Sequence, residues 1–221
     1  MIAVRPLYSK VIGQMMINLP NLLTLSRIFV IVPIVGLFWV DGGWPRWATL
    51  GLYAAACITD FFDGYLARAR GEISRFGRFL DPVADKLLIA SVILMLCAFD
   101  HITGFSILAA MVILCREILV SGLREFLASL RTSLPVSSLA KWKTTIQMFA
   151  LGFLIVGFEA PSWIPAAVIG EIGLWAAAAL TLITGYDYLA IGVRHMADNP
   201  EGDQDSKGRS SDEISVPRRV D

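Results

Sequence analysis

Apolar residues fill six long stretches of this chain, and short polar segments separate them. The stretches cover residues 21–40, 47–68, 76–98, 105–128, 140–158 and 163–193. Each is close to or above the roughly 20 residues that a helix needs to cross a bilayer. Turn-forming sequence separates them, such as DGGWP at 41–45 after the first stretch. We therefore predict an all-α polytopic membrane protein with six transmembrane helices. Gly170 and Gly173 leave open a break in the last helix.

The two ends of the chain differ in composition from this apolar body. Residues 1–17 mix basic and apolar side chains, a pattern typical of a short helix that lies in the membrane interface. From residue 198 onward the chain is rich in Asp, Ser, Gly, Lys and Arg, which predicts a disordered tail. We accordingly expect an N-terminal interfacial segment over 1–17, a six-helix transmembrane domain over 18–197 and a cytoplasmic tail over 198–221.

Composition and charge agree with a membrane protein and predict its orientation. Of the 221 residues, 56% are hydrophobic and 17% are charged, and the mean hydropathy is +0.64. This composition excludes a soluble domain with a large core. If the chain crosses the membrane six times, every Lys and Arg except Arg46 lies on or near the side that carries both termini. Basic residues favour the cytoplasmic side. We therefore expect both termini in the cytoplasm, and a bacterial cytoplasmic membrane as the location.

Four aspartates lie where the second apolar stretch ends and the third begins. Residues 59–86 read TDFFDGYLARARGEISRFGRFLDPVADK. On the first of two helices, five residues would have the spacing i, i+3, i+4, i+7 and i+8 and would therefore share one face: Asp60, Asp63, Gly64, Ala67 and Arg68. The second would carry Gly77, Asp81 and Asp85 at i, i+4 and i+8. Two such helices, facing each other, would bring four carboxylates together beside small residues that leave room for a ligand.

Carboxylates at such close range repel one another and raise one another's pKa unless cations offset their charge. Four of them balance two divalent metal ions, and hard oxygen ligands suit Mg²⁺ or Mn²⁺. Two such ions can hold a pyrophosphate and stabilise charge on both sides of an in-line displacement. A carboxylate can also accept the proton of an attacking hydroxyl. Asp60 lies roughly 12 Å along a helix from Arg68, near the depth of lipid phosphates, so we expect a lipid substrate.

The motif at 60–85 resembles a known family signature at every fixed position. The signature of the CDP-alcohol phosphotransferases is D-x-x-D-G-x-x-A-R, followed by eight residues of any kind and then by G-x-x-x-D-x-x-x-D, and residues 60–85 match it. Over about 18–193 the chain is similar to the branch that forms phosphatidylglycerophosphate, with PNLLTLSR at 20–27, RFGRFLDPVADK at 75–86, REILVSGLRE at 116–125 and LAKWKTTIQM at 139–148. The resemblance implies a six-helix membrane homodimer. Its implied activity is transfer of a phosphatidyl group from CDP-diacylglycerol to an alcohol, with release of CMP and no nucleic-acid partner.

The resemblance also implies roles for individual residues. The four aspartates would surround two divalent cations, Mg²⁺ or Mn²⁺, and Asp85 would be the general base that activates the acceptor hydroxyl. The residues implied in binding CDP-diacylglycerol are Asp60, Gly64, Ala67, Arg68 and Gly77, since small residues permit close approach and a guanidinium suits phosphate. The first helix could line the donor pocket with Asn21, Thr24 and Arg27, although helix capping and membrane anchoring explain these residues as well.

The acceptor sn-glycerol 3-phosphate carries a phosphate of its own, so a second cationic pocket is required beside the metals. An intramembrane arginine is a functional candidate by default, although Arg116 could instead pair with a buried glutamate. The candidates for this pocket are Arg116, Arg124, Lys141 and Lys143, with Tyr188 and Arg194 near the end of the last helix. The nearest alternative is the same chemistry with another acceptor, either phosphatidylglycerol or an inositol phosphate.

Two alternatives come from other functional classes. A cation transporter could line its permeation path with the aspartates, but it would have no use for Arg68 or for the Gly and Ala positions of the motif. Ion flux into proteoliposomes without CMP release would favour it. A noncatalytic membrane scaffold has no need for the acidic cluster.

Overall fold

The structure is a computed structural model that describes residues 19–70, 75–129 and 138–198. Within these ranges it does not describe the side chains of 19–21, 23, 61–70, 75–79, 128–129, 138, 140–141, 187 and 191–198. The expected interfacial helix over 1–17, and all but the first residue of the expected tail, lie outside the described residues. The division of the chain into three segments stays a prediction.

The described residues form six α-helices and one short 3₁₀ helix, and they contain no strand. The elements are α2 (Leu19–Leu37), α3 (Gly43–Arg70), α4 (Arg75–Ala98), α5 (Ser106–Ser129), α6 (Ser138–Val156), η1 (Gly157–Glu159) and α7 (Ala166–Asp198). The six helices follow the six apolar stretches in order and nearly in length, so the all-α prediction is confirmed. Two segments, Ser106–Leu127 and Ala166–Ala190, are long and apolar enough to cross a membrane. The number of spans stays a prediction.

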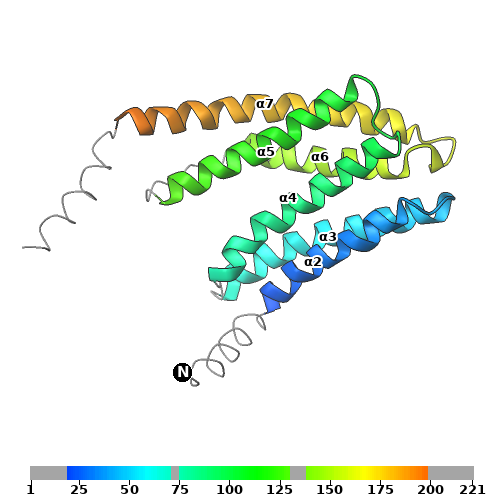
Figure 1. Cartoon of the computed structure of the whole chain (residues 1–221), viewed down its shortest axis with the longest axis horizontal. Coiled ribbons are helices and arrows are strands. Elements are labelled where there is room, and N and C mark those ends of the chain that lie inside the picture. The colour runs from blue at the N-terminus through cyan, green and yellow to red at the C-terminus, as the bar shows by residue number, and fades with distance from the viewer. Residues whose placement is uncertain (1–18, 71–74, 130–137, 199–221) are drawn as a thin grey trace, which may run out of the picture.

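The helices form two groups that lie side by side (Figure 1). In one group α2 packs against both α3 and α4, and in the other α7 packs against both α5 and α6. Contacts between α3 and α6 and between α4 and α5 join the groups. Fully buried apolar side chains from five helices fill the interior, among them Ile34, Val92, Leu96, Ile113, Leu151, Ile155 and Leu174. Because α2 contacts both α3 and α4, side chains on its inner face can reach the polar residues of both.

The approach of α6 to α7 depends on two glycines. A Cβ atom at Gly170 would lie 2.7 Å from Cγ of Leu154, and one at Gly173 would lie 2.8 Å from Cβ of Ala150. Helix α7 continues through both positions, so it is not broken there. Small residues allow helix backbones to approach closely, as is common in membrane proteins. These glycines therefore serve packing between helices rather than a break in one.

Replacing Gly170 with Ala should destabilise the protein by about 1–3 kcal/mol, because the added methyl group overpacks this interface. Thermal unfolding of the purified protein in detergent measures the effect. Gly51→Ala is the matched control, since Gly51 lies on an exposed face of α3 with nothing within 4 Å of the added Cβ. Its melting temperature should stay the same or rise, because Ala favours helix over Gly. Equal losses in both variants would contradict the proposed role of the glycine contact.

Candidate active site

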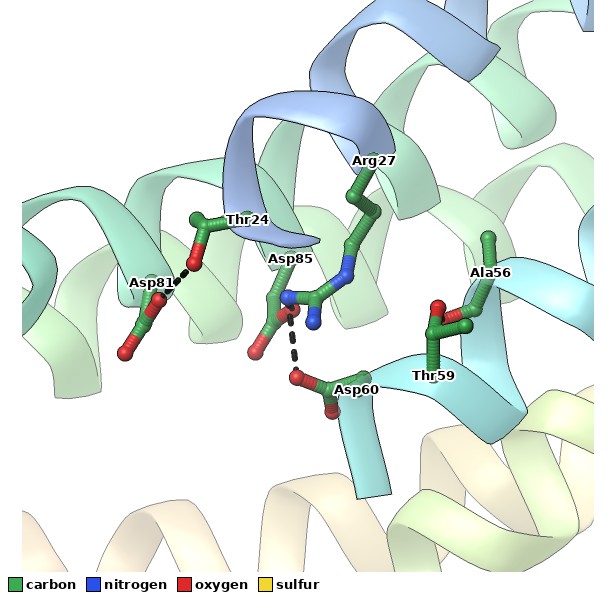
Figure 2. A network of polar contacts seen from close by, with 7 residues as sticks. All are labelled: Thr24, Arg27, Ala56, Thr59, Asp60, Asp81 and Asp85. Carbon is green, nitrogen blue, oxygen red and sulfur yellow. Dashed lines mark hydrogen bonds and ion pairs between the residues drawn. The ribbon is translucent and has the colours of Figure 1, made fainter. Parts of the chain in front are cut away.

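Polar side chains from three helices meet where α2 packs against α3 and α4 (Figure 2). Arg27 comes from α2, Asp60 from α3 and Asp85 from α4. Nη1 of Arg27 donates to Oδ1 of Asp85 at 2.5 Å and lies 2.8 Å from Oδ1 of Asp60. One guanidinium nitrogen therefore joins the two carboxylates.

Burial explains why these three groups stay together. Arg27 is only 2% exposed, whereas the side chains of Asp60 and Asp85 are 44% and 46% exposed. A buried guanidinium is stable only beside compensating anions, and the two carboxylates supply that charge. Because each carboxylate keeps almost half of its surface open, both remain accessible to a further ligand.

Asp81 lies one turn before Asp85 on α4 and has a different partner. The hydroxyl of Thr24, on α2, donates to Oδ1 of Asp81. Thr24 is buried, whereas Asp81 is exposed. Thr24 and Arg27 lie three residues apart, so one face of α2 serves both aspartates of α4. The expected shared face of Asp81 and Asp85 is confirmed.

The remaining residues of the motif can be placed only by their backbone. Asp63, Gly64, Ala67 and Arg68 lie in the last part of α3, and Gly77 lies in the first turn of α4. Their side chains are outside the described set, so their assigned roles stay predictions.

The observed carboxylates fit part of a metal site. Two hard oxygen donors, one each from Asp60 and Asp85, converge on a single cationic nitrogen. That donor chemistry suits Mg²⁺ or Mn²⁺. Among the side chains that the structure describes, no group of three or more His, Cys, Asp or Glu residues is placed to hold a metal ion. Asp60, Asp81 and Asp85, which are described, thus do not by themselves form such a group, and the set of four that includes Asp63 stays a prediction.

A second polar cluster joins α5 to α7. Nη2 of Arg116 donates to the hydroxyl of Thr184 at 2.9 Å. The ring of Tyr188, which is buried, has its centroid 5.7 Å from Cζ of Arg116 and 5.5 Å from Cζ of Arg124. Nε of Arg116 is buried and has no hydrogen-bond partner within the described residues. The structure thus brings together two of the predicted acceptor-binding arginines, and their role in binding stays a prediction.

Lys143 of α6 joins α5 through Glu117. Its ammonium group donates to Oε1 of Glu117, and the lysine is only 2% exposed. Glu117 therefore pairs with Lys143, whereas Arg116 hydrogen-bonds to Thr184. The side chains of Lys141 and Arg194 lie outside the described set.

A further polar contact, which joins α4 to α5, was not predicted from the sequence. The ammonium group of Lys86, the residue after Asp85, donates to the hydroxyl of Ser121. Ser121 lies one turn after Glu117, so a single face of α5 bonds lysines from both α4 and α6. The four-residue spacing of Glu117 and Ser121 in the sequence could have indicated this shared face. The role of Thr24 and Arg27 as partners of the aspartates was also not foreseen.

An apolar cavity of about 660 Å³ lies between α3 and α6. Cys57 and Ile58, which line it, lie within one helical turn of Asp60. The cavity therefore comes within one helical turn of Asp60, although neither Asp60 nor Asp85 lines it. Other lining residues are Trp47, Tyr53, Ala54 and Met148.

Comparison with known proteins gives consistent matches at the sequence level. The profile of the CDP-alcohol phosphatidyltransferase family matches residues 17–183. The CDP-diacylglycerol–glycerol-3-phosphate 3-phosphatidyltransferase of Rickettsia typhi is 50% identical over 171 residues, which cover 77% of this chain and 94% of that protein. The protein of the same name from Cereibacter sphaeroides is 35% identical over 216 residues, covering 82% and 98%. That of Shigella flexneri is 39% identical over 181 residues, covering 80% and 95%.

A solved structure has a similar fold. It is the crystal structure of Mycobacterium tuberculosis phosphatidylinositol phosphate synthase in complex with manganese and citrate. The two chains align with a TM-score of 0.58 and 18% identity, over 79% of this chain and 82% of that one. At this identity the likeness shows the fold alone.

Proposed function

Since the chain belongs to the CDP-alcohol phosphatidyltransferase family, we propose that it transfers the phosphatidyl group of CDP-diacylglycerol to sn-glycerol 3-phosphate. The products are phosphatidylglycerophosphate and CMP. Relatives of 35–50% identity that are named for this acceptor support the choice. The observation that carries the proposal is the convergence of Asp60 and Asp85 on one cationic nitrogen, because it gives a paired anionic site at which a diphosphate–metal complex can bind.

The proposed setting is the bacterial cytoplasmic membrane, crossed by six helices of each subunit of a homodimer, with both termini in the cytoplasm. The two long apolar helices support membrane insertion. Exposed tryptophans near the α2–α3 turn and before α7 support an aromatic belt at the outer interface: Trp39, Trp44, Trp47 and Trp163. The aspartates lie toward the other ends of α3 and α4, as cytoplasmic substrates require.

We assign the metal site to Asp60, Asp63, Asp81 and Asp85, which would hold two divalent cations, Mg²⁺ or Mn²⁺. The convergent oxygens of Asp60 and Asp85 support this assignment, as does the manganese in the solved structure of similar fold. When bound, the ions would supply positive charge that stabilises the negative charge developing on CMP as the P–O bond within the diphosphate breaks.

The chain's own residues would perform the remaining steps. The primary hydroxyl of the acceptor attacks the phosphorus bonded to diacylglycerol, a new P–O bond forms, and the P–O bond to CMP breaks. Asp85 accepts the hydroxyl proton, and its half-open carboxylate supports this role. Arg68 and the backbone near Gly64, Ala67 and Gly77 would hold the nucleotide end of the donor.

The acceptor phosphate would bind among Arg116, Arg124, Lys141 and Lys143. The shared contact of both arginines with Tyr188 supports a single pocket. The buried Nε of Arg116, with no hydrogen-bond partner in the described region, supports an anionic ligand. A guanidinium suits a phosphate because it offers several donors in one plane.

An acceptor panel tests the proposal. The purified protein would be incubated with CDP-diacylglycerol, Mg²⁺ or Mn²⁺, and either sn-glycerol 3-phosphate, phosphatidylglycerol or an inositol phosphate. We expect CMP release and a phosphatidylated product only with sn-glycerol 3-phosphate. Product formation with one of the other acceptors instead would show that the protein uses that acceptor and not sn-glycerol 3-phosphate. No CMP with any acceptor would contradict the proposal.

We propose further that an acyl chain of the donor lies in the apolar cavity between α3 and α6, since this cavity passes within one turn of Asp60. Replacing Ala54 with Phe should then raise the KM for a long-chain donor about tenfold, because displacing about two methylene groups costs about 1.6 kcal/mol. A short-chain donor should be affected less. Ala55→Phe is the matched control, because Ala55 is exposed and does not line the cavity. Equal KM values in the two variants would exclude the cavity as the acyl site.

A further inference from the structure

Arg27 contacts two carboxylate oxygens that a divalent cation would also use as ligands. Its Nη1 lies 2.5 Å from Oδ1 of Asp85 and 2.8 Å from Oδ1 of Asp60. A magnesium ion ligated by the same two oxygens would lie about 2.0–2.1 Å from each. The ion and the guanidinium nitrogen would therefore compete for the same two oxygens. Both are cations, so close approach would also cost electrostatic energy.

The surroundings of Arg27 explain why its guanidinium is stable between the two aspartates. The guanidinium is buried, and the two aspartates provide the negative charge that such a group needs. In return, the arginine offsets the repulsion between two carboxylates that belong to different helices. Because α3 and α4 are joined here through α2, the arginine also links the three helices.

We propose that Arg27 is a resident counter-cation: it holds Asp60 and Asp85 together in the metal-free protein, and metal binding displaces its guanidinium. This inference rests on the proposed metal site. Metal binding is then an exchange of one cation for another at the carboxylates of Asp60 and Asp85. The apparent affinity for metal is therefore lower than the carboxylates alone would give. Arg27 acts as a positioning residue, through the two aspartates.

Metal titrations of the purified full-length protein in detergent test this exchange, without nucleotide or acceptor. Free Mn²⁺ would be followed by electron paramagnetic resonance in the wild type and in Arg27→Met. We expect the variant to bind Mn²⁺ about tenfold more tightly, because a competing unit charge within about 4 Å is removed. Unchanged or weaker binding by the folded variant would overturn the proposal.

Thermal unfolding with and without Mn²⁺ separates this exchange from a merely structural role. The metal-free variant should melt at a lower temperature than the wild type, and the rise caused by Mn²⁺ should be larger. A purely structural arginine would lower both melting temperatures equally, which would contradict the proposal. Arg27→Gln, which keeps a polar head group near Asp60, supplies the same comparison if the Met variant does not fold.

Arg46→Gln is the matched control. Arg46 lies on α3 at roughly 21 Å along the helix from Asp60, and its guanidinium lies over the ring of Phe38, 4.7 Å from the centroid. Its loss should leave Mn²⁺ affinity unchanged. If it raises the affinity as much as Arg27→Met does, the effect is a general one of charge and the proposal fails. If the wild type binds no Mn²⁺, the metal site itself fails, a result distinct from unchanged affinity in the variant.

Discussion

Replacing Asp85 with Asn is expected to lower kcat by about 10²–10⁴-fold. An amide cannot accept the proton of the attacking hydroxyl, and it contributes no charge to the metal site. Binding of CDP-diacylglycerol should be largely preserved, because the donor also contacts α3 in the proposed arrangement. Steady-state CMP release gives kcat, and equilibrium binding of the donor gives its affinity.

Asp100→Asn is the control for this variant. Asp100 is exposed in the turn between α4 and α5, at the far end of α4 from Asp85. Its φ of 59° is a conformation that Asn adopts readily, so the change should be neutral for folding. Its turnover should match that of the wild type. Unchanged turnover in Asp85→Asn would remove Asp85 as the general base.

Replacing Arg116 with Gln is expected to lower kcat/KM for sn-glycerol 3-phosphate by about 10–100-fold, since a hydrogen bond to a charged group is worth about 1.5–3 kcal/mol. The loss should appear in the KM for the acceptor, and the KM for CDP-diacylglycerol should change little. Initial rates measured over a grid of both substrate concentrations separate the two constants.

Thr184→Val supplies the comparison for Arg116. It removes the hydroxyl that accepts a hydrogen bond from Nη2 and leaves the guanidinium in place. Its effect on acceptor KM should therefore be smaller than that of Arg116→Gln. An acceptor KM that Arg116→Gln leaves unaltered would remove the arginine from the acceptor pocket.

Much of the fold follows from local sequence because helix length and helix ends depend on nearby residues. The third apolar stretch was expected over 76–98, and α4 covers Arg75–Ala98. The turn at 41–45 separates α2 from α3 nearly where its glycines and proline indicate. The packing order was not predictable in this way. Two motif helices were expected to face each other directly, whereas α2 links α3 and α4 at the aspartates, because long-range packing depends on the whole set of apolar faces.

In the candidate site, too, local features could be predicted from the sequence and long-range contacts could not. The four-residue spacing of Asp81 and Asp85 predicts their shared face, since helical periodicity is local. The partners of the aspartates come from α2, distant in the chain, and spacing alone cannot identify them. The pairing of Glu117 with Lys143 was not predicted for the same reason, because the lysine belongs to another helix.

The most direct test of the two-metal account is a crystal structure with Mn²⁺ and CDP-diacylglycerol, with the metal located by its anomalous scattering. The account predicts two manganese peaks, ligated by Asp60, Asp63, Asp81 and Asp85, beside the diphosphate of the donor, with the guanidinium of Arg27 moved away. Carboxylates that point apart, with no manganese peak between them, would contradict it.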